Sequence, residues 1–84
     1  MPYTVLLKRS AEKEMDRLPT DVHARCVAVL LALADDPRPP QTRKLQDREG
    51  YRLRVGEYRI LYAVNDTDQL VEVFSVGHRR EVYR

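Results

Sequence analysis

The stretch YRLRVGEYRILY, residues 51–62, constrains the fold of this chain more than any other part of its sequence. Three arginines alternate there with large apolar residues on both sides of a Gly56-Glu57 pair. Alternation with a period of two is typical of a β-strand that has one buried face. A two-residue loop that begins with glycine suits a type II′ turn. The stretch therefore predicts a β-hairpin that turns at residues 56 and 57.

Counting outward from this turn predicts the register of the hairpin. The expected pairs are Val55–Tyr58, Arg54–Arg59, Leu53–Ile60, Arg52–Leu61 and Tyr51–Tyr62. Side chains alternate between the two faces of a strand, and opposite residues share a face. We therefore expect Arg52, Arg54 and Arg59 on one face, with the tyrosines and most of the aliphatic residues on the other.

The arginine face indicates a polyanionic ligand. Like charges that lie opposite each other across a ladder repel, as Arg54 and Arg59 would. A phosphate backbone offsets this repulsion, because guanidinium groups bind phosphate oxygens bidentately and stay charged at any working pH. The competing interpretation is an ordinary polar outer face, whose arginines are neutralised by Glu57, Glu72 or water.

The segments before the hairpin are predicted to form a strand and two helices. Residues 3–8 are typical of a short buried strand. Pro19 separates two helical segments whose apolar positions recur at helical spacing. These positions are Ala11, Met15 and Leu18 in the first, and Val22, Cys26, Val29, Leu30 and Leu33 in the second. We expect the two helices to cover the apolar face of the hairpin.

The remaining segments predict a connector and a last strand. Residues 35–50 are polar and proline-rich, with a brief strand around residues 44–46. The run LVEVFSVG, residues 70–77, follows a loop too short for a crossover helix, so it is expected to pair antiparallel. If Glu72 marks its solvent side, alternation places Phe74, Val76 and His78 on the arginine face. Val71, Val73 and Ser75 then point toward the helices.

Composition limits the kind of site that this chain can carry. A chain of 84 residues buries only about 60–65% of its unfolded surface, so we expect one domain, residues 1–84, without a deep cofactor cavity. The lone Cys26 allows no internal disulfide and favours a reducing cytoplasm. No apolar run approaches the ~18 residues of a membrane span. We therefore expect no membrane partner, no metal and no cofactor.

The ending GHRREVYR, residues 77–84, adds groups that RNA cleavage requires. Attack by a 2′-OH needs proton transfer, positive charge on the pentavalent phosphate and a donor for the leaving oxygen. His78 has an ordinary pKa near neutrality, although an isolated histidine is more often an ordinary surface residue. Tyr83 is an aromatic group on which a base can stack.

These residues carry a resemblance to the RelE/ParE superfamily of bacterial and archaeal toxins, and more closely to its RelE branch. The stretch RKLQDREGYRLRVGEYRILYAV resembles the basic hairpin that both branches share, and VFSVGHRREVYR resembles the ending of the RelE branch. The resemblance implies an α+β fold: a four-stranded antiparallel sheet with an N-terminal helical hairpin packed on one face, RelE-like and similar to small microbial ribonucleases.

The RelE branch implies a toxin that cleaves mRNA in the ribosomal A site and is held inactive by a cognate antitoxin. Catalytic residues carried over by match are Arg52, Arg54, Arg59, Arg79 and Tyr83. Arg59 falls on the phosphate-stabilising arginine and Arg79 on the proposed general acid. His78 is the better candidate for a base, because an arginine is a poor proton acceptor. Further RNA contacts are expected from Arg43, Lys44, Arg48 and Arg80.

Two other functions remain open on the sequence alone. A ParE-like protein would inhibit DNA gyrase by binding, without chemistry of its own. A member that has lost activity would only bind RNA or an antitoxin, and arginine instead of the family's frequent lysine at positions 52 and 54 is compatible with such a loss.

Overall fold

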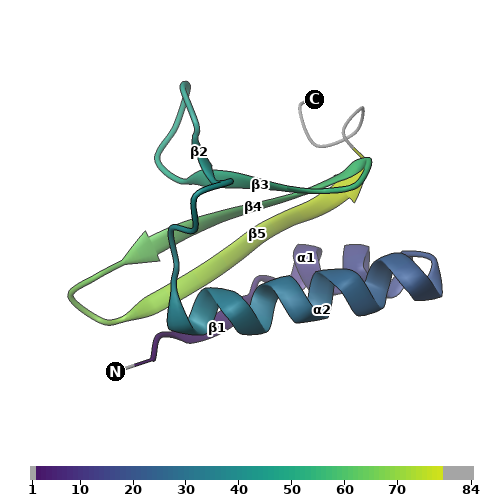
Figure 1. The fold of residues 1–84 in the computed structure, drawn as a ribbon, viewed down its shortest axis with the longest axis horizontal. Helices are drawn as coiled ribbons and strands as arrows, with labels where there is room; N and C mark the ends of the chain where they lie inside the picture. Colours follow the sequence, from purple (N-terminus) through teal and green to yellow (C-terminus); the bar gives the residue numbers. More distant parts are fainter. Residues whose placement is uncertain (1, 79–84) are drawn as a thin grey trace.

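The computed structural model describes residues 2–78, and Arg79, Arg80 and Tyr83 lie outside the described residues. In chain order the elements are β1 (Thr4–Leu7), α1 (Arg9–Asp16), α2 (Thr20–Asp35), β2 (Arg43–Lys44), β3 (Tyr51–Val55), β4 (Tyr58–Asn65) and β5 (Leu70–His78). Figure 1 shows both helices on one face of a twisted sheet, with the loop between β2 and β3 projecting away from them. No helix within residues 2–78 is both long and apolar enough to cross a membrane.

The sheet has five strands and is mixed, so the predicted four-stranded antiparallel sheet is wrong in detail. The strand order is β1-β5-β4-β3-β2, with β1 parallel to β5 and the other pairs antiparallel. The short β2 supplies the extra strand at one edge. At the other edge, β1 is parallel to β5. Parallel pairing needs a long connection, and the two helices between β1 and the later strands provide it. Thr4 and Leu6 are exposed, so the expected buried strand is a half-exposed edge strand.

The predicted hairpin is confirmed in register and in facing. All five expected pairs of β3 and β4 are present. A type II′ turn requires a positive φ at its first central residue only. Gly56 has a φ of 61° and Glu57 does not have a positive φ, so the turn meets this requirement. Leu53, Val55 and Ile60 point into the main core.

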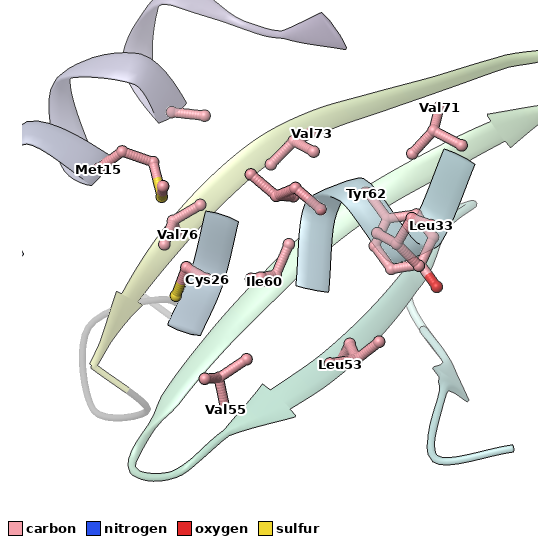
Figure 2. Packing of buried hydrophobic residues seen from close by; sticks show 12 residues of the cluster. Met15, Cys26, Leu33, Leu53, Val55, Ile60, Tyr62, Val71, Val73 and Val76 are labelled. Carbon is pink, nitrogen blue, oxygen red and sulfur yellow. The ribbon is translucent and has the colours of Figure 1, made fainter. Parts of the chain in front are cut away.

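The core lies between the helices and the inner face of the sheet (Figure 2). Its helical contributors are Ala11 and Met15 from α1 and Cys26, Leu30 and Leu33 from α2, which confirms the predicted apolar stripes. Burial raises the pKa of the Cys26 thiol, as expected for a core residue. Tyr62 is also buried there, and its hydroxyl donates a 2.8 Å hydrogen bond to the Pro37 carbonyl. Tyr62 thereby fixes the start of the connector to the sheet.

A surface network joins four distant parts of the chain. Arg38 in the connector makes a bidentate contact with Asp66, at 2.8 Å and 3.2 Å, and donates to the Tyr51 hydroxyl at 3.0 Å. The Tyr3 hydroxyl donates to Asp66 at 2.6 Å. The hydrogen bond from Arg38 is the main cause that lowers the pKa of Asp66, and the bond from Tyr3 adds to it. The network therefore stabilises the fold while Asp66 is ionised.

The network predicts a loss of stability in acid. Because the pKa of Asp66 is lower in the folded chain than its ordinary value of 3.8, its contribution is present above that value and is lost as the pH falls through the folded pKa. We expect Asp66→Asn to remove this part of the pH dependence. Urea unfolding of both proteins between pH 7 and about 2 measures it. Curves that keep a constant separation throughout that range would contradict the prediction.

Candidate RNA-binding and catalytic face

The arginine face is the side of the sheet opposite the helices, and β-pairing arranges its residues in two rows. In one row Arg54 lies opposite Arg59, which lies opposite Gly77 on β5. In the next row Arg43, Arg52, Leu61 and Ser75 follow one another across four strands. Arg52 and Arg59 are half-buried, whereas Arg43 and Arg54 are exposed. Four arginines are thus held on one rigid surface.

Arg54 shows that part of this charge is balanced within the protein. Its Nε donates to the Gly56 carbonyl at 2.8 Å, and its Nη2 lies 3.7 Å from Glu57 Oε1. Both side chains are more than half exposed, at 57% and 60%. An exposed pair of this kind contributes about 0–1 kcal/mol. It holds the Arg54 guanidinium loosely at the turn.

Arg52 borders an open hollow of about 370 Å³ beside β2. The other lining residues are Lys44, Leu45, Gln46 and Asp47. In the register of β2, Lys44 lies opposite Tyr51 rather than on the row of Arg52. The hollow therefore brings Lys44 and Arg52 to one concave surface that is large enough for part of a nucleotide. Among residues 2–78, no three His, Cys, Asp or Glu side chains gather as metal ligands do.

The predicted facing of β5 is correct as far as Phe74 and wrong beyond it, because the strand contains a bulge. Leu61 pairs with Ser75 and Tyr62 pairs with Val73, so Phe74 is an extra residue between them. The insertion shifts the alternation by one residue. Val76 is therefore in the main core beside Cys26 and Met15 (Figure 2), and Ser75 shares the row of Leu61 on the arginine face.

The same bulge moves His78 away from the arginine face, which corrects its expected position. His78 pairs with Tyr58, a residue of the helix-facing side, and their rings meet edge to face at 5.6 Å. His78 also lines a surface hollow. The other residues of this hollow are Tyr58, Val76 and Gly77 of the sheet and Glu14 and Arg17 of the helical half. The structure therefore separates His78 from Arg52, Arg54 and Arg59 by the thickness of the sheet.

Glu14 holds the last part of β5, a role that sequence reasoning missed. Strand β1 pairs with β5 only as far as Val73. Past that point the Val76 N–H faces α1 and donates to Glu14 Oε1 at 2.9 Å. Glu14 thus replaces the missing partner strand directly before Gly77 and His78. A glutamate one position before the buried Met15 was the only available sequence signal.

Removal of this carboxylate is expected to loosen the end of β5. Glu14→Ala leaves the half-buried Val76 N–H without its acceptor, which costs about 1–3 kcal/mol, whereas Glu14→Gln keeps an acceptor oxygen. We expect amide hydrogen exchange at Val76 to accelerate about 5- to 150-fold in Glu14→Ala and much less in Glu14→Gln. Glu12→Ala, an exposed position on the same helix, serves as the control. Unchanged exchange in Glu14→Ala would contradict the prediction.

One further candidate for RNA binding lies in the loop between β2 and β3. Arg48 is exposed in the loop between β2 and β3, and its Cζ lies 4.1 Å from the centroid of the Phe74 ring. Arg79, Arg80 and Tyr83 lie outside the described residues, so their roles stay predictions.

Comparison with known proteins places this geometry in a family. A model of the ParE toxin of the type II toxin–antitoxin system parDE matches residues 5–83. The toxins RelE and RelG of Mycobacterium tuberculosis (strain ATCC 25618 / H37Rv) are 32% and 34% identical, over 99% and 100% of this chain and 88% and 99% of their own lengths. The crystal structure of the toxin–antitoxin complex RelBE2 from Mycobacterium tuberculosis matches with a TM-score of 0.81 at 30% identity, over 94% of this chain and 100% of that chain.

These matches span nearly the whole chain, and they confirm the resemblance seen in the hairpin and in the ending. The chain is a toxin of the type II toxin–antitoxin class and belongs to the RelE/ParE superfamily, on its RelE branch.

Proposed function

We propose that this toxin is a ribosome-dependent endoribonuclease that cleaves mRNA in the cytoplasm. The arginine face carries the proposal, because Arg52, Arg54 and Arg59 project from one side of a rigid hairpin. The relatives named RelE support the same activity. We further propose that residues 1–84 act as one toxin domain.

In the proposed reaction the 2′-oxygen attacks the neighbouring phosphorus and the bond to the 5′-oxygen breaks. Arg59 stabilises the charge that builds on the phosphate oxygens. Its neighbour on β5 is Gly77, which has no side chain to occupy the space beside Arg59. Arg52 and Arg54 bind the substrate phosphate and lower the pKa of the 2′-OH. Its proton passes to water, because an arginine does not accept it. Arginine supplies the charge, and the proposed reaction therefore requires no metal ion.

Proton donation to the leaving 5′-oxygen is assigned to Arg79, and stacking or proton handling to Tyr83. His78 is not assigned the role of base, because its register places it on the helix-facing side. The proposed site is therefore an electrostatic one, in which the ribosome supplies the alignment that a small open surface lacks.

Primer extension on mRNA bound to purified ribosomes tests the proposal. We expect cleavage that appears only with ribosomes and that persists in EDTA. The match to the ParE model favours one alternative, inhibition of DNA gyrase. That function predicts broken DNA and intact mRNA after induction of the toxin. Intact mRNA in the presence of ribosomes would overturn the proposal. If the DNA is intact as well, the remaining function is that of a protein that only binds RNA or an antitoxin.

We also propose that a cognate antitoxin binds this toxin, as in the RelBE2 complex. The helical half offers an apolar hollow for it, which Leu31, 69% exposed, lines together with Val5 and Leu7 of β1. This hollow adjoins β1, whose outer edge has no partner strand among the described residues. An exposed edge and a nearby apolar surface suit an added strand or an amphipathic helix.

A further inference from the structure

Phe74, the extra residue of the bulge in β5, is an aromatic residue on the arginine face. Phe74 follows the core residue Val73 and precedes Ser75, which pairs with Leu61 on the arginine face. Phe74 is half-buried and does not belong to the main core cluster. A Cβ atom added to Gly50, in the loop before β3, would lie 3.4 Å from the Phe74 ring and 3.3 Å from Leu45. Phe74 is thus part of a small apolar floor under that loop.

Arg48 lies on this aromatic ring. Its guanidinium carbon is 4.1 Å from the ring centroid, close enough for the planar group to rest against the ring. The side chain is exposed, and none of the ion pairs seen among residues 2–78 includes Arg48. A planar cation is therefore held in position by an aromatic group below it while its outer side faces solvent.

We propose that Arg48 and Phe74 form a stacking platform for one unpaired base of the RNA strand. The inference rests on the proposed function and extends it, because it assigns the base contact that the arginines do not supply. Arginine planes and aromatic rings are the groups on which unpaired bases stack. Phe74 directly precedes Ser75, at the end of the row that contains Arg43 and Arg52. A strand whose phosphates lie on that row can place a base on Arg48.

A short oligoribonucleotide that carries 2-aminopurine measures the stacking directly. Binding to the intact toxin is expected to quench the 2-aminopurine fluorescence at one position of the strand. Arg48→Lys keeps the charge but removes the plane, and Phe74→Leu keeps the apolar volume but removes the ring. We expect each to weaken binding by about 5-fold or more and to restore the fluorescence, because stacking is worth about 5- to 150-fold in affinity per base.

Two controls separate stacking from charge. Arg9→Lys makes the same chemical change at an exposed position of α1 and is expected to leave affinity and fluorescence unchanged. An oligoribonucleotide without the base at the quenched position is expected to bind the toxin and the Arg48→Lys variant equally. Absence of RNA binding, binding without quenching, or equal loss with the abasic strand would overturn the platform. Ribosome-dependent cleavage is measured separately, so a toxin that stacks RNA without cleaving it would contradict only the proposed function.

Discussion

Arg59→Ala is expected to lower the rate of ribosome-dependent mRNA cleavage by about 10²- to 10³-fold, the usual cost of removing one group that stabilises transition-state charge. Arg59 is the central residue of its row, between Arg54 on β3 and Gly77 on β5. It is half-buried, so the surrounding residues of the sheet restrict the motion of its side chain. A phosphate bound there meets a preorganised charge.

Single-turnover cleavage on programmed ribosomes measures this effect, because it separates the chemical step from binding. Arg59→Lys keeps the charge but loses the bidentate geometry, and we expect an intermediate rate. Arg9→Ala removes an arginine from the helical half and is expected to cleave at the wild-type rate. A folded Arg59→Ala protein that cleaves as fast as the wild type would overturn the role of Arg59, and thermal melting establishes that the variant is folded.

The hairpin could be predicted residue by residue because its information is local. The Gly-Glu turn fixes which residues lie opposite, and alternation then fixes the faces. The helical stripes follow from spacing in the same way. The strand β1 was predicted from its residues, but its pairing follows from neither rule, because its partner β5 lies far along the chain and two helices intervene. Its parallel pairing is a property of the assembled sheet.

The position of His78 could not be predicted for a different physical reason. Parity counting assumes an unbroken ladder, and one extra residue at Phe74 reverses every later side chain. One feature of the sequence did argue against strict alternation, because it would have placed the apolar Val76 on the outer face of the sheet. Burial of Val76 in the core stabilises the bulged register, and this gain places His78 beside Tyr58.

Gly50→Ala is expected to be the most destabilising of the substitutions considered. Gly50 adopts a φ of 129°, which residues with a side chain rarely adopt, and an added Cβ would lie 2.7 Å from the Tyr62 carbonyl oxygen. That oxygen belongs to the backbone of β4, so relief requires movement of the sheet rather than of a side chain. Strain and overlap together are expected to cost about 2–4 kcal/mol. The melting temperature should fall by about 10–30 °C.

Gly56→Ala is the matched control, because it introduces the same atom at the other positive-φ glycine of the described chain. Gly56 has a φ of 61°, and its added Cβ would meet only the flexible Arg25 guanidinium, at 3.4 Å. We expect a cost of about 1 kcal/mol there, from the left-handed backbone alone. Urea unfolding compares the two variants. Equal losses would show that backbone conformation, and not the approach of the Gly50 loop to β4, governs both positions. A larger loss at Gly50 would show that this close approach, which also seats the loop of Arg48 against Phe74, is built into the stability of the arginine face.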